Sequence, residues 1–138
     1  MLLQMPDCPF CGKNLAPIIY GDDLCFAVVS PNPINRYHVL VIPRVHHEGF
    51  VDLPDELAAH LFVVAKRLSA AVRKACAPVA VHHISDDDIQ RRGYNLVPHY
   101  KLHIIPRFEG DGIIMEWKRE NLDLAERTRI AQEIKAEL

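Results

Sequence analysis

The sequence lacks a long apolar run, a basic tract and an N-terminal secretion signal. No apolar stretch among its 138 residues approaches the roughly 20 residues that cross a bilayer. The 16 basic residues are scattered among 18 acidic ones, and the net charge is −2. This balance argues against a general nucleic-acid or membrane surface, so neither is an expected partner. Residues 1–7 hold no basic region followed by an apolar one, so we expect no signal peptide.

Cysteine is also scarce, and its spacing does not suggest a disulfide framework. Of the four cysteines, Cys8 and Cys11 form a Cys-x-x-Cys pair, whereas Cys25 and Cys76 are expected to be inert core thiols. Two thiolates at this spacing can share one zinc ion, which normally takes four ligands. A redox pair and a chance spacing are the alternatives. Redox use is disfavoured because no helix begins after Cys11 to lower a thiolate pKa. This usage is typical of a cytoplasmic protein.

The apolar content, 49%, is sufficient for one compact domain over residues 1–138. Apolar runs on either side of Gly21-Asp22-Asp23 predict a β-hairpin. A helix is expected to begin near Pro54, to place apolar residues at helical spacing, and to end before Pro78. Further strands are predicted at residues 37–42, 79–84 and 98–107, and a second helix at 121–138. The expected fold is α+β, a five-stranded antiparallel sheet with one long helix packed on it and a C-terminal helix, with its core at about 8–117.

The most informative segment is the run at residues 98–107. In a strand, His99, Lys101 and His103 project from one face, while the apolar residues between them project from the other. A row of three nitrogen-bearing groups is suited to phosphate or to a metal. The alternative is a half-buried strand whose polar outer face happens to carry two histidines. Pro106 is expected to end the hydrogen-bond ladder, because it has no N–H to donate.

This run resembles the signature of the histidine triad (HIT) family, in which three histidines alternate with apolar residues and Ile-Pro-Arg often follows. The resemblance covers roughly residues 8–117. It implies that the middle position holds the nucleophile that takes the nucleotidyl group, and here that position is Lys101. It also implies that His103 and His38 stand beside the phosphate. Family members usually pair as homodimers, so a homodimer is expected as well.

The same resemblance assigns the substrate site, which is expected to take a purine nucleotide or nucleoside phosphate. Phe26 is expected as a wall for the base, with a plain core residue as the alternative. Ser30 stands where relatives carry an acid for the ribose, and a serine cannot accept from two hydroxyls as a carboxylate does. Asn95 can still donate to a phosphate, whereas Leu96 offers no polar group. In relatives with a leading Cys pair, the equivalents of Cys8, Cys11, His46 and His99 close a structural zinc site.

Lys101 leaves two functions open. A lysine amine is normally protonated and not nucleophilic, although burial can depress its pKa by several units. The first function is a hydrolase or transferase acting on a nucleoside phosphoramidate, a dinucleoside polyphosphate or an acyl-adenylate, with impaired or altered chemistry. The second is a non-catalytic nucleotide- or phosphate-binding module stabilised by zinc. The altered residues Ser30 and Leu96 favour a charged Lys101 that binds phosphate over a nucleophile.

Overall fold

The computed structural model describes residues 7–11, 17–114 and 116–138, so most of the N-terminal stretch expected to carry no signal peptide lies outside the described residues. Its elements in chain order are β1 (Ile18–Gly21), β2 (Cys25–Val29), β3 (Val39–Pro43), the short 3-10 helix η1 (Phe50–Asp52), α1 (Asp55–Cys76), β4 (Ala80–Ile84), β5 (Leu102–Arg107) and α2 (Leu124–Ala136). Within the described part of the chain, no helix is long and apolar enough to cross a membrane.

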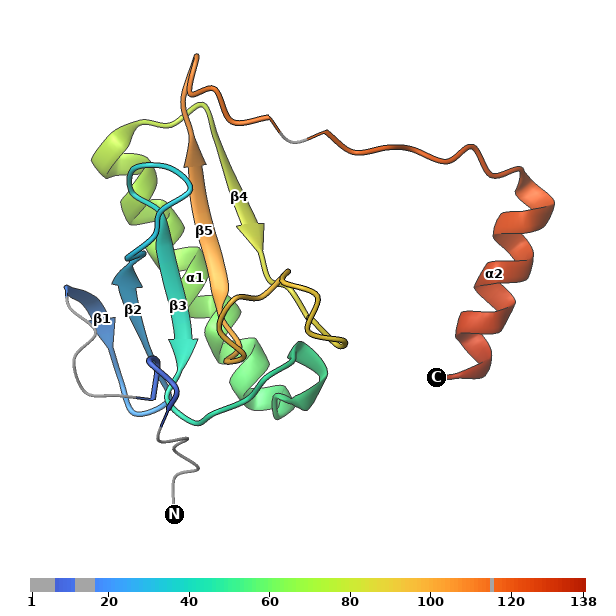
Figure 1. Ribbon diagram of the computed structural model, residues 1–138, viewed down its shortest axis with the longest axis horizontal. Coiled ribbons are helices and arrows are strands. Elements are labelled where there is room, and N and C mark those ends of the chain that lie inside the picture. Colours follow the sequence, from blue (N-terminus) through green and yellow to red (C-terminus); the bar gives the residue numbers. More distant parts are fainter. Residues whose placement is uncertain (1–6, 12–16, 115) are drawn as a thin grey trace.

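The five strands form one sheet in the order β1-β2-β3-β5-β4, and every neighbouring pair is antiparallel. Figure 1 shows this sheet with β3 and β5 at its centre. The central position of β3 agrees with its sequence, because all five of its residues are buried. The predicted α+β architecture with a five-stranded antiparallel sheet is confirmed.

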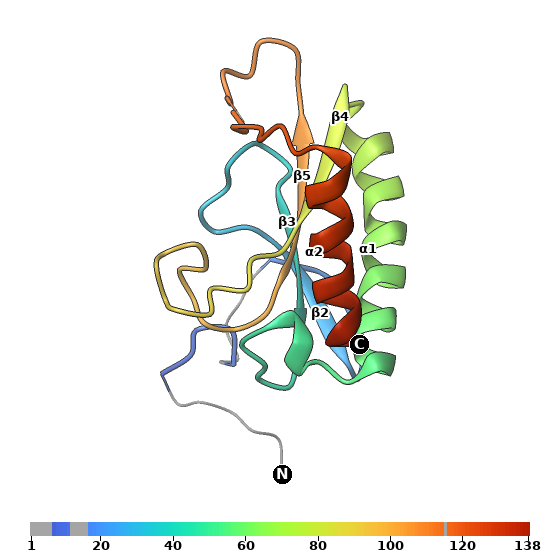
Figure 2. The ribbon, with the colours of Figure 1, turned by 90° about the vertical axis from the view of Figure 1, so that its right-hand side faces the viewer.

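One face of the sheet is covered by α1 (Figure 2). The helix begins after Pro54, carries Asp55 in its first turn, and ends where Ala77 takes a left-handed conformation ahead of Pro78. Its buried side chains follow helical spacing at Leu57, Leu61, Val64, Ala65 and Val72. They pack on alternate residues of the sheet, and this cluster forms the larger core.

The opposite face of the sheet carries loops instead of a helix, as Figure 2 shows. A second, smaller cluster of buried apolar residues lies on this face: Phe10, Phe26, Val28, Leu40 and Ile42. The sheet therefore has a packed core on both sides. The loop-covered side has room for polar groups because none of the described helices covers it.

The signature run differs from its predicted boundaries. β5 begins at Leu102, not at residue 98, and residues 98–101 belong to the loop that precedes it. The expectation that Pro106 ends the ladder is wrong, because Pro106 lies opposite Val81 and the strand runs on to Arg107. An antiparallel strand tolerates proline where its missing N–H would not point to a partner.

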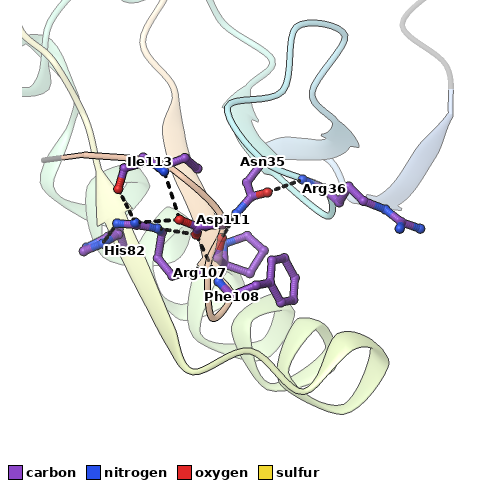
Figure 3. Close-up of polar contacts among 8 residues, drawn as sticks. Asn35, Arg36, His82, Arg107, Phe108, Asp111 and Ile113 are labelled. Atoms are coloured by element: carbon purple, nitrogen blue, oxygen red, sulfur yellow. Dashed lines mark hydrogen bonds and ion pairs between the residues drawn. The ribbon is translucent and has the colours of Figure 1, made fainter.

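A polar network fixes the end of β5 to the loop that precedes β3 (Figure 3). The carboxylate of Asp111 accepts two hydrogen bonds from the guanidinium of Arg107, at 2.7 and 2.9 Å. The amide of Asn35 donates to Asp111 and to the carbonyl of Pro106, both at 3.1 Å. Bidentate pairing of this kind has a defined geometry. The network holds the loop at residues 31–37 beside the central strands, directly before His38.

The C-terminal helix is present but is shorter than predicted, at Leu124–Ala136, and Asp123 caps its N-terminus by accepting from the backbone N–H of Glu126. It stands at the end of an extended segment, away from the sheet (Figure 1). None of its residues is buried, and Leu124 and Ile134 are 70% and 60% exposed. The apolar spacing predicted the helix but not a packing partner.

Candidate functional site

The alternation predicted for the signature run is confirmed. Tyr100, Leu102 and Ile104 belong to the core under α1. Lys101 and His103 instead line a cavity on the loop-covered face. This division follows from strand geometry, because neighbouring side chains point to opposite faces of a sheet.

This cavity has a volume of about 250 Å³ and lies between the loop before β3 and the loop before β5. Phe10 and Leu40 supply apolar surface. Its predicted polar residues are Ser30, His38, Asn95, Lys101 and His103, and all five line it. Phe26 does not line the cavity; it packs in the apolar cluster of Phe10 and Leu40 beneath, with the guanidinium of Arg44 over its ring at 5.5 Å. The β-sheet position of Phe26 makes it part of the core.

A chain of hydrogen bonds sets the orientation of the two histidines. The backbone N–H of Ile34 donates to Nδ1 of His38 at 3.0 Å, so the ring proton of His38 is on Nε2. That Nε2 lies 2.9 Å from Nδ1 of His103 and donates to it. Because Nδ1 of His103 accepts, its proton is on Nε2. His103 therefore presents an N–H donor beyond the pair, where an anion can accept it.

Both histidines stay neutral near physiological pH. Burial lowers the pKa of His38 to about 4, and the neighbouring His103 acts in the same direction. Burial also lowers the pKa of His103 to about 4, assisted by the charge of Lys101. The positive charge beside the cavity is therefore carried by Lys101 and not by an imidazolium.

Lys101 is 6% exposed and its amine is held by two acceptors. It donates to the side-chain oxygen of Asn95 and, at 2.8 Å, to the carbonyl of Val97. The ring of Phe10 lies 5.2 Å from Nζ, within range of a cation–π contact. Burial lowers the pKa of Lys101 to about 8, against the opposing charges of Cys8 and Asp86. Two of the three N–H donors of the ammonium are occupied, which leaves one for a ligand.

Asp86 is a cavity residue that the sequence reasoning missed. It lies in the loop between β4 and β5, lines the cavity, and its charge acts on Lys101. Burial raises its pKa, and the charge of Lys101 opposes that rise. A run of three aspartates gives no signal for which one faces inward. Only the path of the loop between β4 and β5 decides this.

The predicted metal ligands Cys8, Cys11, His46 and His99 lie together. Their donor atoms all fall within 4.8 Å of one another. Nδ1 of His99 is 3.4 Å from the sulfur of Cys8 and 3.5 Å from that of Cys11. Nδ1 of His46 is 3.4 Å from the sulfur of Cys11. Two sulfurs and two imidazole nitrogens at such separations can hold one metal ion.

The surroundings of the two imidazoles also fit a metal. Nε2 of His99 lies 2.9 Å from the carbonyl of Pro43 and donates to it, so Nδ1 carries a free lone pair. Nε2 of His46 is buried without a hydrogen-bond partner among the described residues, and the carboxylate of Glu48 lies 3.9 Å away. Burial lowers the pKa of His99 to about 4, which keeps its ring neutral as a ligand must be.

Comparison with known proteins gives one consistent result. The sequence profile of the HIT domain matches residues 12–110. An uncharacterized HIT-like protein of Methanocaldococcus jannaschii is 32% identical over 133 residues, which cover 93% of this chain and 98% of that protein. An Arabidopsis thaliana protein named adenylylsulfatase HINT3 is 28% identical and matches 84% of this chain and 58% of its own length.

Solved structures agree with the sequence matches. A HIT family protein from Bacillus anthracis superposes with a TM-score of 0.87 at 27% identity, over 96% of this chain and 98% of the other. A histidine triad nucleotide-binding protein from Candida albicans superposes with a TM-score of 0.80 over 94% and 96% of the two chains. Its 20% identity makes it a match of fold alone.

The lowered pKa values of His38 and His103 predict how stability depends on pH. Both rings titrate near pH 4 when folded and near 6.5 when unfolded. Between these values the unfolded chain binds more protons, so the free energy of unfolding should rise from pH 4 to pH 6.5 and level off above. The His103→Gln variant should lose at least about 1 kcal/mol of this rise.

Urea unfolding of the wild type and the variant at each pH measures this effect. Gln132 on α2 is exposed and does not titrate, so Gln132→Ala is the control and should keep the wild-type dependence of the unfolding free energy on pH. If the free energy of unfolding rises equally with pH in the wild type and in His103→Gln, the assignment of His103 as a buried neutral ring is contradicted.

Proposed function

Because the chain belongs to the HIT domain family, we propose that it is a nucleotide-binding protein whose cavity holds the phosphate of a purine nucleotide or nucleoside phosphate. The single observation that carries this proposal is the convergence of Lys101 and His103 on one cavity. An ammonium donor and a neutral imidazole donor suit an anion that accepts from two directions. The name of the plant adenylylsulfatase supports the same class of ligand.

In this proposal Lys101 binds the phosphate as a charge. Nζ of Lys101 donates to the side-chain oxygen of Asn95 and to the carbonyl of Val97, as a protonated amine does. A phosphate oxygen then accepts the third N–H, and His103 donates a second hydrogen bond. His38 acts through His103, because it fixes that ring and does not itself present a free donor. His103 contacts the ligand and His38 is its positioning residue.

The proposal includes impaired or altered nucleotidyl chemistry. In the reaction that the family resemblance implies, an imidazole at the position of Lys101 attacks phosphorus and later leaves. An amine forms a stronger bond to phosphorus and needs an acid to leave, and His103 is neutral. Turnover of a phosphoramidate, a dinucleoside polyphosphate or an acyl-adenylate should therefore be slow. The second candidate, a binding module without turnover, is favoured by the same anchoring of the amine.

Ribose recognition should be weak. Ser30 lines the cavity and is 8% exposed, so its hydroxyl can meet a sugar hydroxyl there. A single hydroxyl cannot accept from two vicinal hydroxyls as a carboxylate does. Asp86 faces the cavity from the other side and is the nearby carboxylate that could accept from a ligand.

Zinc is the proposed ion for the Cys8, Cys11, His46 and His99 cluster. Two thiolates with two imidazoles form a tetrahedral donor set that zinc prefers. Four protein ligands leave no position for a reacting water, so the ion is structural. It would tie the N-terminal segment and the chain after β3 to His99, which is two residues before Lys101.

We also propose a cytoplasmic homodimer of single-domain chains that uses neither nucleic acid nor membrane. Among the strands that the structure describes, β4 is an edge strand that pairs with β5 alone, and this leaves its outer backbone edge for a second copy. Exposed apolar side chains of α1 lie next to this edge, with Phe62 47% exposed, in a groove shared with β4. A two-fold pairing of such edges is a common arrangement in dimers.

Substitution of Lys101 tests the nucleotide proposal. Lys101→Ala should weaken AMP binding by roughly 10- to 100-fold, because a charge-assisted bond of about 1.5–3 kcal/mol is lost.

The wild type should hydrolyse adenosine phosphoramidate slowly, and Lys101→His should hydrolyse it faster. Calorimetry and a product assay measure the two effects, and Lys74→Ala on the exposed surface of α1 is the matched control. Robust wild-type turnover abolished by Lys101→Ala would instead make Lys101 the nucleophile, and wild-type protein that does not bind AMP would refute the proposal.

Removal of the metal tests the zinc proposal. Purified protein should contain at least one zinc per chain by elemental analysis, and a chelator should lower its melting temperature. Cys8→Ser should contain one zinc per chain fewer than the wild type and melt at a lower temperature, whereas Cys76→Ser should keep the wild-type zinc content. A metal-free preparation whose melting temperature does not respond to added zinc or chelator would contradict the proposal.

A further inference from the structure

A second group of metal-ligating side chains lies at the β1–β2 turn. Asp22 comes from the turn, Cys25 from the first position of β2, and His60 from α1. One donor atom from each residue lies within 4.8 Å of the other two. Cys25 belongs to the core under α1, whereas Cys8 packs against the apolar cluster on the other face of the sheet. The group is therefore separate from the nucleotide cavity and from the first cysteine cluster.

The carboxylate of Asp22 is held in one orientation. Its Oδ1 accepts from the backbone N–H groups of Leu24 and Cys25, both at 2.8 Å. Its Oδ2 accepts from the hydroxyl of Tyr20 at 2.7 Å. Burial opposes ionisation, but these hydrogen bonds prevail and lower the pKa of Asp22. A carboxylate that hydrogen bonds hold in one orientation and keep ionised has the properties of a metal ligand.

The other two donors approach the same oxygen. Nε2 of His60 lies 2.7 Å from Oδ2, and the sulfur of Cys25 lies 3.9 Å from it. Ligands of a tetrahedral zinc ion lie about 3.3–3.8 Å apart, given bond lengths of about 2.0–2.3 Å. The sulfur is already near that spacing. A rotation of the His60 side chain, which is 30% exposed, is enough to bring its nitrogen into range.

The cysteine also departs from an ordinary core thiol. Its side chain is fully buried, yet the sulfur faces an ionised carboxylate instead of apolar atoms on every side. A thiol is only a weak donor to such a group. A cation between the sulfur and the carboxylate would satisfy both. The exposed sides of Asp22 and His60 provide an entry path for the ion.

We propose that Asp22, Cys25 and His60 form a second binding site for a divalent cation of the zinc class, with a water as fourth ligand. When the metal binds, the sulfur–hydrogen bond of Cys25 breaks, its proton passes to solvent and the thiolate bonds to the cation. The proton that Nε2 of His60 donates to Asp22 also leaves to solvent, Nδ1 takes up a proton in exchange, and the lone pair of Nε2 bonds to the cation. The ion would join the β1–β2 turn to α1. An open fourth position distinguishes this site from the closed four-ligand cluster.

Cobalt(II) titration tests this site, because thiolate coordination gives a charge-transfer absorption band. The experiment uses metal-free Cys8→Ser/Cys11→Ser protein, in which the first cluster has lost both of its thiolates. One cobalt per chain should bind with a thiolate band. The band should disappear with Cys25→Ser, and the affinity should fall by about tenfold to a hundredfold or more with His60→Gln. Cys76→Ser should leave the thiolate band and the cobalt affinity unchanged.

The wild-type chain gives a second reading that does not depend on folding of the cysteine variants. Two cobalt ions per chain should bind, and His60→Gln should reduce the number bound at a fixed low cobalt concentration to one. The proposal is overturned if the thiolate band is absent from the Cys8→Ser/Cys11→Ser protein. It is equally overturned if His60→Gln binds cobalt as the wild type does.

Discussion

The antiparallel pairing of β3 with β5 is the constraint on which the rest of the structure depends. Leu40 lies opposite His103 and Val39 lies opposite Ile104, so the register fixes which side chains of each strand share a face. A slip of one residue would turn Lys101 and His103 towards α1 and would expose Tyr100 on the loop side. The apolar core and the polar cavity are therefore two consequences of one register. Neither can change without the other.

The same strand run connects the cavity to the cysteine cluster. His99, Lys101 and His103 occupy alternate positions, so about 7 Å of chain separates each group from the next. His99 belongs to the cluster of metal-ligating groups, Lys101 supplies the charge, and His103 supplies a neutral donor. A displacement of His99 will also displace Lys101, which follows it by two residues. This coupling gives a physical reason why the proposed zinc would hold the proposed phosphate-binding groups in place.

Much of this arrangement could be predicted from the sequence, because strand alternation and helical spacing are local properties. The alternation placed Lys101 and His103 on one face and Tyr100 on the other, as the structure has them. What escaped prediction depends on long-range packing. The inward-facing Asp86 is set by the path of a loop, and the exposure of α2 depends on what lies beside it. The continuation of β5 through Pro106 depends on the side of the strand on which the pairing strand lies.

The central claim is that the ammonium of Lys101 and the neutral imidazole of His103 converge on one phosphate, in the cavity between the loop before β3 and the loop before β5. A crystal structure of the chain with bound AMP tests it most directly. The account predicts a phosphate oxygen within hydrogen-bond distance of Nζ of Lys101 and another within reach of Nε2 of His103, with the base directed towards Phe10 and Leu40. A phosphate bound elsewhere, or a cavity in which these two side chains point away from the phosphate, would contradict it.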